Sequence, residues 1–241
     1  MSTPPSHEPQ AVQARYARRG EAHRYHMGRP EVWHTVFERQ AAMLRLLNRH
    51  GAMDFSHLTL VEVGCGAGGN LLEFLRWGWD PAHLAGIELL PERAHHARTV
   101  LPARVRVIEG DACAAPVEPE SVDIVFQSTV FSSLLDMSYQ QQLADIMWSW
   151  VKPGGAVLWY DFCVNNPRNP DVAGVPMKRV RQLFPQAQAD GMRVTLAPPL
   201  ARGVCRLHPA LYGVVNALPW LRTHRLVWLG KPSDPSTLST D

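Results

Sequence analysis

The sequence predicts an α/β fold built on a doubly wound, mostly parallel sheet of seven strands. Between residues 59 and 161, short apolar runs alternate with helical patterns at regular intervals. This alternation implies right-handed crossover connections and helices on both faces of one sheet. A cluster of glycines also follows the first apolar run directly, and ligands of such sheets bind beyond the carboxyl ends of the strands.

Five strands are expected in the alternating region and two more after it. The expected strands are residues 59–63, 83–88, 104–108, 122–127, 156–161, 191–197 and 223–229. Helices are expected between the first five strands, at residues 71–77, 91–100 and 138–151. Pro91 suits a first helical turn, and Pro153 with the two glycines after it is expected to stop the third helix before the fifth strand.

The regions on either side of the sheet are expected to be helical. Residues 12–50 have an amphipathic helical pattern and are interpreted as a lead-in to the first strand. The polar residues at both ends of the chain are expected to be disordered, at the start over residues 1–10. The resulting division is an amino-terminal helical cap at 1–55, a main domain at 56–232 and a disordered tail at 233–241.

A helical insertion is expected over about residues 198–220, before the last strand. Apolar residues recur there at helical spacing, with interruptions at Pro209 and Gly213. The segment is too long for a simple hairpin between two strands. It would cover the sheet, act as a substrate lid or form a dimer face.

Composition and charge describe an ordinary globular protein. The formal net charge is only +2 and the arginines are scattered, so neither a nucleic-acid nor a membrane partner is indicated. Four widely separated cysteines argue against a disulfide framework or a zinc site and favour a reducing compartment. No signal peptide or membrane-spanning stretch is visible, so a cytoplasmic location is expected.

The glycine-rich turn after the first strand is the most informative functional feature. Residues 61–70 read VEVGCGAGGN, so an apolar strand turns at once into a helix. Glycine permits tight left-handed turns and close approach of a ligand to the backbone, while unpaired N–H groups begin the helix. Gly64, Gly66 and Gly69 also satisfy the dinucleotide pattern GxGxxG, with Glu88 at the distance expected for a ribose ligand. An NAD(P)-dependent oxidoreductase is therefore one alternative.

The residues around this turn favour a different ligand. Glu62 stands two residues before the first glycine, where its carboxylate would repel a pyrophosphate. The same carboxylate would suit a ligand that carries an ammonium and a sulfonium group. Polar residues also follow the second, third and fourth strands, at Glu88, Asp111 and Gln127.

Five motifs in this order resemble those of the class I S-adenosylmethionine-dependent methyltransferases, of the type 11/25-like kind. They are VEVGCGAGG, GIELLPERAHHAR, VIEGDA, SVDIVFQSTVFSSL and VKPGGAVLWYDF, which together span about residues 58–162. The resemblance implies a Rossmann-like sheet of seven strands with one antiparallel strand. It also implies S-adenosyl-L-methionine as the cofactor and S-adenosyl-L-homocysteine as its product.

The resemblance implies roles for individual residues. The glycines would admit the methionine part of the cofactor, and Glu62 would favour its ammonium group or fix the loop. Glu88 would accept hydrogen bonds from both ribose hydroxyls. Asp111 would accept one from the adenine amino group or cap its own loop, and Gln127 would lie near the carboxylate or sulfonium end. The full set of expected cofactor contacts is Glu62, Gly64, Cys65, Gly66, Gly68, Asn70, Glu88, Leu89, Asp111, Ala112, Gln127 and Ser128.

Asp161 and Tyr160 are the candidate catalytic residues, because they end the fifth strand at the ligand edge of the sheet. Burial would raise the pKa of Asp161 toward values useful for a general base. The alternative is an anchor for the loop that follows.

Candidate substrate contacts come from the lead-in and from the loops after the fourth and fifth strands. Arg168 would pair with an acidic or phosphorylated acceptor, although its loop is alternatively a turn stiffened by prolines. Tyr16 and Tyr25 would close over the cofactor, whereas each histidine of the lead-in is alternatively a surface or packing residue. The set of expected substrate contacts is Tyr25, His26, Thr129, Asn165 and Arg168.

The expected activity is methyl transfer to oxygen of a small-molecule or metabolite acceptor. The fourth strand ends in QSTV, so the usual signature for methylating exocyclic amines of nucleobases is missing. No Pro-Cys dipeptide is present, and no acidic residue follows that strand before Asp136, which disfavours covalent and metal-dependent sites. We therefore expect no metal, no nucleic-acid partner, no membrane insertion, and a monomer or homodimer. A non-catalytic methyltransferase-like binding protein is the second alternative.

Overall fold

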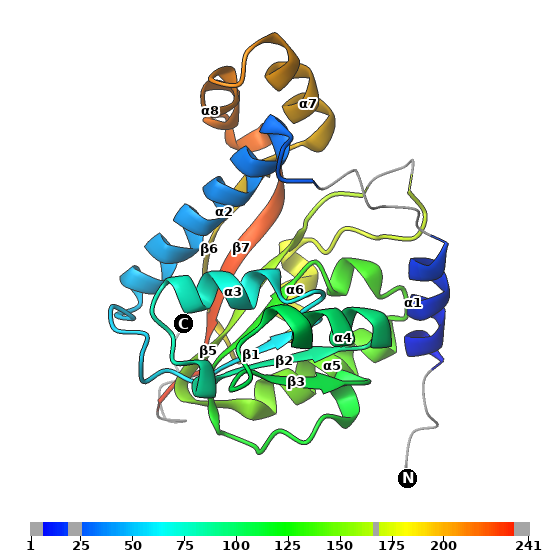
Figure 1. Cartoon of the computed structure of the whole chain (residues 1–241), viewed down its shortest axis with the longest axis vertical. Helices are drawn as coiled ribbons and strands as arrows, with labels where there is room; N and C mark the ends of the chain where they lie inside the picture. Colours follow the sequence, from blue (N-terminus) through cyan, green and yellow to red (C-terminus); the bar gives the residue numbers. More distant parts are fainter. Residues whose placement is uncertain (1–6, 19–25, 166–168, 234–241) are drawn as a thin grey trace.

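A single mixed sheet of seven strands forms the centre of the computed structural model, which describes residues 7–18, 26–165 and 169–233 (Figure 1). The strand order is β3-β2-β1-β4-β5-β7-β6. Strand β7 runs antiparallel to both of its neighbours, β5 and β6. The other four pairs, β3–β2, β2–β1, β1–β4 and β4–β5, are parallel. The predicted architecture of seven strands with one antiparallel strand is confirmed.

The bounds of the elements follow the expected alternation. The strands are β1 (Leu60–Val63), β2 (Leu84–Glu88), β3 (Arg106–Glu109), β4 (Val122–Ser128), β5 (Val151–Phe162), β6 (Gln188–Leu196) and β7 (Arg222–Gly230). The α-helices are α1 (Glu8–Ala17), α2 (Pro30–Arg49), α3 (Gly69–Arg76), α4 (Pro91–Val100), α5 (Met137–Trp150), α6 (Met177–Leu183), α7 (Pro198–Leu207) and α8 (Leu211–Asn216). Short 3-10 helices are η1 (Pro81–His83), η2 (Ala112–Ala114), η3 (Phe131–Ser133) and η4 (Pro219–Leu221).

Two apolar clusters fill the space between the sheet and the helices, one on each face. Helices α5 and α6 cover one face, where Trp159 of β5 is fully buried. Helices α2, α3 and α4 cover the other, where Leu158 and Tyr160 of the same strand point. Successive side chains of a strand point to opposite faces, so β5 contributes to both clusters. Both its faces are buried, which explains its nearly continuous apolar sequence.

Strand β5 begins earlier than predicted. Val151 already pairs with Val122, and the register shifts before Ala156 pairs with Ile124. The segment around Pro153 is therefore an irregularity inside the strand rather than a stop signal before it, because α5 has already ended at Trp150.

The helical flanks differ from prediction in three places. The lead-in contains two helices, α1 and α2, rather than one continuous pattern. Residues 8–10 are helical rather than disordered, because the Glu8 carboxylate is held by partners described below. Helix α6 was not predicted, since its seven residues are too few to give a clear periodic pattern.

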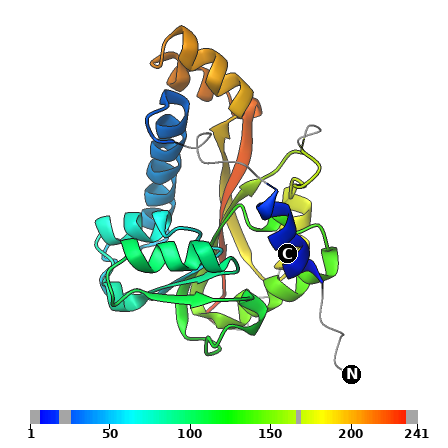
Figure 2. The same cartoon turned by 45° about the vertical axis from the view of Figure 1, so that its right-hand side comes forward.

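The predicted insertion consists of α7 and α8, which stand at one end of the molecule beyond α2, β6 and β7 (Figures 1 and 2). A small apolar cluster holds the two helices together and against β6. Its buried members are Leu196, Ala201, Cys205 and Tyr212. Across the described part of the chain, no helix combines the length and the apolar character that crossing a membrane requires.

Candidate functional site

The turn after β1 is held in left-handed backbone conformations by three glycines. The φ angles of Gly64, Gly66 and Gly68 are +70°, +56° and +87°, values that L-residues adopt only at a cost of about 1–2 kcal/mol. The backbone N–H groups of Gly64 and Cys65 both donate to the carbonyl of Ile87, over 2.8 and 3.1 Å. The turn is therefore tied to the end of β2.

The Glu88 carboxylate, at the end of β2, joins this turn to the next loop. Its Oε2 accepts the N–H of Gly66 at 2.7 Å, and its Oε1 accepts the N–H of Leu90 at 2.8 Å. A carboxylate oxygen has two lone pairs, so each oxygen keeps the capacity for one further donor. Glu88 also lines a cavity beside the turn. The residue is thus oriented by the backbone and still able to accept hydrogen bonds from a diol.

Glu62 is a buried carboxylate with one unsatisfied oxygen. The Asn70 side chain donates to its Oε1 at 2.6 Å, while its Oε2 has no hydrogen-bond partner. Complete burial raises the pKa of Glu62 to about 8, against the lowering effect of the Asn70 hydrogen bond. A buried polar atom without a partner is costly. The orphaned oxygen fits a cationic group such as an ammonium.

The pH dependence of stability is expected to report the burial of Glu62. In the folded protein this carboxyl keeps its proton up to about pH 8, whereas the ordinary pKa of a glutamate side chain is 4.5. The folded state therefore binds more protons between these values, and stability falls as the pH rises through that range. Glu62→Gln is expected to flatten this decline, measured as urea midpoints across the range. An equally steep decline in the variant would contradict the assignment.

Arg39 of α2 brings the helical cap into contact with these residues. Its guanidinium donates to Asn70 Oδ1 at 2.7 Å and to Ser128 Oγ at 3.4 Å, and it lies 5.2 Å from the centre of the Tyr160 ring. Arg39 is not among the predicted site residues. The signal that it offers in the sequence is an arginine inside the amphipathic pattern of the lead-in. Arg39 links the amino-terminal cap to the ends of β4 and β5.

Asp111 both caps its own loop and borders the cavity. Its carboxylate accepts the N–H of Cys113 at 2.8 Å and a short hydrogen bond from the hydroxyl of Tyr139 on α5. Asp111 is thus the N-cap of η2, which is the capping role given above as the alternative to a contact with adenine. Tyr139, which sequence analysis missed, fixes the carboxylate from the neighbouring helix.

A cavity of about 160 Å³ lies at the carboxyl ends of β1, β2 and β4. A larger one of about 510 Å³ shares Leu89, Asp111 and Tyr139 with it. The predicted site residues that line the smaller cavity are Gly64, Glu88, Leu89, Asp111, Ala112, Ser128 and Thr129. Residues far apart in the sequence therefore meet at the strand ends, as expected for a doubly wound sheet.

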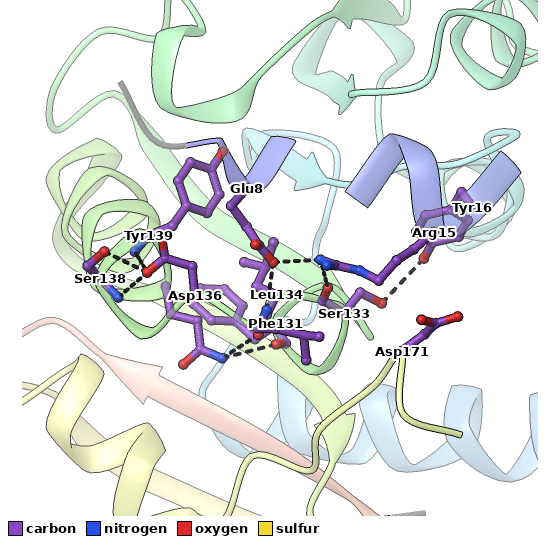
Figure 3. A network of polar contacts seen from close by, with 12 residues as sticks. Glu8, Arg15, Tyr16, Phe131, Ser133, Leu134, Asp136, Ser138, Tyr139 and Asp171 are labelled. Atoms are coloured by element: carbon purple, nitrogen blue, oxygen red, sulfur yellow. Dashed lines mark hydrogen bonds and ion pairs between the residues drawn. The ribbon is translucent and has the colours of Figure 1, made fainter. Parts of the chain in front are cut away.

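Helix α1 closes one side of this cavity with Pro9, Val12 and Tyr16. A network of polar contacts holds the helix there (Figure 3). Glu8 Oε1 accepts from Arg15 and from the backbone N–H of Leu135, each at 2.6 Å. Arg15 also donates to the carbonyl of Ser133 at 2.9 Å.

Tyr16 contributes an aromatic wall to the cavity. Its hydroxyl lies 3.4 Å from Ser133 Oγ, and the Arg93 guanidinium lies 4.5 Å from the centre of its ring. This position is compatible with the prediction that Tyr16 closes over a cofactor. The predicted partner in that role, Tyr25, lies outside the described residues.

Six predicted cofactor contacts line neither cavity: Glu62, Cys65, Gly66, Gly68, Asn70 and Gln127. The Cys65 side chain packs in the core against Gly86, and burial raises the pKa of its thiol. Gly68 is the left-handed N-cap of α3. Gln127 is fully buried; its side chain accepts the N–H of Val130 at 3.0 Å. Direct contact of these residues with a cofactor stays a prediction.

Asp161 and Tyr160 are buried away from both cavities. Asp161 accepts the N–H groups of Phe162 at 2.8 Å and Ser132 at 3.1 Å, and burial raises its pKa to about 6. The Tyr160 hydroxyl lies 2.8 Å from Thr195 Oγ1, and burial raises its pKa to about 12. The contacts of Asp161 favour the anchoring alternative. Its role as a general base stays a prediction.

Asp161→Ala is expected to separate the two roles of this carboxylate. Loss of two hydrogen bonds to a charged group would cost about 3–6 kcal/mol of stability, and the variant would keep most of its turnover per folded molecule. A general base would instead contribute about 10²–10⁴-fold to turnover. Thermal unfolding and single-turnover rates of the folded fraction measure the two effects. A large loss of rate without loss of stability would refute the anchoring role.

The predicted substrate residues are dispersed. Thr129 lines the cavity at the end of β4 and has a left-handed φ of +58°, unusual for a non-glycine residue. Asn165 accepts the N–H of Gly174 at 2.8 Å, and the exposed His26 accepts that of Gly28 at 3.0 Å, so both fix local turns. Arg168 lies outside the described residues. Among described residues, no group of three or more His, Cys, Asp or Glu is arranged to hold a metal ion.

Comparison with known proteins relates this geometry to one family. Residues 60–155 match a family described as a methyltransferase domain, whereas the chain matches no curated protein. The match includes the glycine turn, Glu88 and Asp111, and it ends at Gly155 in β5. Four of the five motifs quoted above lie wholly within the matched segment, which ends inside the fifth.

Solved structures are similar to most of the fold, and three of them are described here. A SAM-dependent methyltransferase from Archaeoglobus fulgidus is 14% identical with a TM-score of 0.56, covering 83% of this chain and 100% of its own. The phosphoethanolamine N-methyltransferase 2 of Haemonchus contortus, solved with S-adenosyl-L-methionine, is 18% identical with a TM-score of 0.58, covering 78% and 52%. The [4+2]-cyclase SpnF is 16% identical with a TM-score of 0.56, covering 81% and 84%. At these identities the similarities establish the fold alone.

Proposed function

We propose that this chain, a class I S-adenosylmethionine-dependent methyltransferase, transfers the methyl group of its cofactor to an oxygen of a small-molecule acceptor. The observation that carries the assignment of the site is one cavity bordered by the glycine turn, the Glu88 carboxylate and Asp111. These are the groups that the family resemblance assigns to the methionine, ribose and adenine parts of the cofactor. Family membership does not specify the acceptor or the methylated atom, so the small-molecule acceptor and its oxygen are the parts that we propose.

The residues of the site fit this cofactor. The orphaned Glu62 oxygen suits an ammonium group, and the free lone pairs of Glu88 suit two ribose hydroxyls. A Cβ on Gly66 would meet no protein atom within 4 Å, so the space beside the Gly66 backbone is free for a ligand atom. When bound, S-adenosyl-L-methionine supplies an activated methyl group on a sulfonium leaving group.

The protein is proposed to contribute alignment and exclusion of water. Helix α1 covers the cavity with apolar and aromatic side chains, and its network with the loop after β4 holds it in place. Alignment of reacting groups in a dry site accelerates such a transfer without further chemistry from the protein. Thr129, strained at the cavity edge, is the residue of this loop best placed to contact an acceptor, because strained backbone concentrates at active sites.

Oxygen is proposed as the acceptor atom because the sequence after β4 lacks the amine signature described above. A hydroxyl loses a proton in such a transfer, and the Asp161→Ala variant described above tests whether Asp161 takes it.

A transfer assay tests the proposed function. The protein is incubated with S-adenosyl-L-methionine carrying a carbon-13 methyl group and with a small-molecule extract of the host cell. The expected product is heavier by one labelled methylene, and the chemical shift of its methyl carbon identifies an oxygen-bound methyl group. A methyl resonance bound to nitrogen or carbon would refute the choice of oxygen. Absence of any labelled product and of S-adenosyl-L-homocysteine would refute the activity.

A further inference from the structure

The tip of the molecule, residues 198–221, exposes an unusual number of apolar side chains. It comprises α7, α8 and η4, and both overall views place its two α-helices at one end of the molecule (Figures 1 and 2). Six of the 14 exposed large hydrophobic side chains among the described residues lie in the tip: Leu200, Leu207, Leu211, Val214, Leu218 and Trp220. Leu207 and Trp220 are 81% and 70% exposed. Single exposed apolar residues are ordinary, but a gathering of this kind marks an interaction surface.

Helix α7 buries its small residues and exposes its large ones. Ala201 and Cys205 pack into the small cluster with Leu196, whereas Leu200 and Leu207 face solvent. A helix that only covers a sheet would place its leucines inward. The apolar surface of the tip is therefore additional to what the fold requires.

The charge of the tip is of one sign. No acidic residue occurs between Asp190 and Asp234, and six of the 24 Lys and Arg residues of the chain lie in that interval. Within the tip the two arginines, Arg202 and Arg206, are both exposed and lie on α7 among the exposed leucines. The tip thus combines exposed leucines and a tryptophan with positive charge.

Two acidic residues of the adjacent helix α2 lie near the tip. Glu31 lies 3.9 Å from its ion-pair partner Arg29. The Glu38 carboxylate accepts the N–H of Thr195 at 3.1 and 2.9 Å and keeps its negative charge. Both belong to α2 and not to the surface formed by α7, α8 and η4, whose Lys, Arg, Asp and Glu side chains are all basic.

We propose that the tip docks on the surface of a bilayer that contains anionic phospholipids. Apolar side chains with arginines among them suit the boundary between headgroups and acyl chains, where a tryptophan ring is also favourable. The absence of acidic residues across the tip provides charge complementarity to that surface. Since no described helix is suited to crossing a membrane, the tip lies on the bilayer rather than across it.

The topology places the docking surface at the same end of the sheet as the cavity, namely the end where the parallel strands finish. Helix α7 follows the carboxyl end of β6, and the glycine turn follows the carboxyl end of β1. Strand β6 points in the same direction as β1, because β6 and β5 are both antiparallel to β7 and β5 is parallel to β4 and β1. Docking would bring the cavity toward the lipid surface. The docking proposal itself does not depend on the reaction catalysed.

Vesicle co-sedimentation of the full chain tests the proposal. Vesicles of phosphatidylcholine alone are compared with vesicles that also contain phosphatidylglycerol. The expected result is tighter binding to the anionic vesicles by about tenfold or more, with a loss of about fivefold for each of Arg202→Gln and Arg206→Gln. The double variant Leu207→Ser with Trp220→Ser is expected to lose most binding to both vesicle types.

The matched control is Met53→Ser with Arg104→Gln, on loops that enter β1 and β3 at the opposite edge of the sheet. These side chains are 72% and 69% exposed, so they match the tip residues in exposure. All variants alter exposed side chains and should unfold within a few degrees of the parent. Equal losses in tip and control variants, or no binding to anionic vesicles, would overturn the proposal. Concentration-dependent dimerisation that the tip variants abolish, without vesicle binding, would instead assign the surface to a second copy.

Discussion

Glu88→Ala is expected to weaken S-adenosyl-L-homocysteine binding by about 100-fold or more. Two hydrogen bonds from ribose hydroxyls to a carboxylate are worth about 1.5–3 kcal/mol each, and 1.4 kcal/mol corresponds to a tenfold change in affinity. The substitution also releases the N–H groups of Gly66 and Leu90, so the turn loses part of its support. Isothermal titration calorimetry measures the affinity, and thermal unfolding measures the fraction folded.

Two further variants separate binding from folding. Glu88→Gln keeps one acceptor oxygen and is expected to bind more tightly than the alanine variant. Glu118→Ala removes an exposed carboxylate that lines neither cavity, and its affinity should equal that of the parent. Parental affinity in a folded Glu88→Ala protein would show that the ribose site has been misplaced.

Gly64→Ala is expected to lower stability by about 2–5 kcal/mol. The φ of +70° costs an L-residue about 1–2 kcal/mol. The new Cβ would lie 2.6 Å from Val130 Cγ2, and such overpacking costs about 1–3 kcal/mol. For a protein of this size the loss corresponds to a fall of roughly 5–15 °C in melting temperature.

Gly66→Ala is the matched control for this effect. Its φ of +56° carries the same backbone strain, but its Cβ would meet no protein atom within 4 Å. Gly66→Ala should therefore lower the stability by only about 1–2 kcal/mol. Combining Gly64→Ala with Val130→Ala should restore the part of the loss due to the clash. Equal melting temperatures for the two single glycine variants would contradict the account of the turn.

The fold was predictable because its pattern is local and repeated. Each strand is a short apolar run, and the glycine turn and Pro91 mark element boundaries in the sequence. The errors occur where tertiary contacts override local pattern. Residues 8–10 are helical because Glu8 is bound by Arg15 and by a backbone N–H more than 120 residues away, which no local signal reveals.

The meeting of Gly64, Glu88 and Asp111 at one cavity was predictable in the same way, whereas the contacts of the neighbouring helices were not. Motif order placed Gly64, Glu88 and Asp111 at strand ends, and topology then brought them to one cavity. Arg39 and Tyr139 reach the site from helices, so their contribution depends on how α2 and α5 pack. Asp161 ends an apolar strand as expected, but the sequence did not reveal that backbone donors occupy its carboxylate.

A calorimetric comparison of two ligands on the unmodified protein tests the cofactor assignment most directly. We expect S-adenosyl-L-homocysteine to bind at one site per chain, with an affinity that Glu88→Ala reduces, and we expect no binding of NAD. Binding of NAD without binding of S-adenosyl-L-homocysteine would refute the cofactor assignment and identify the glycine turn as a dinucleotide site.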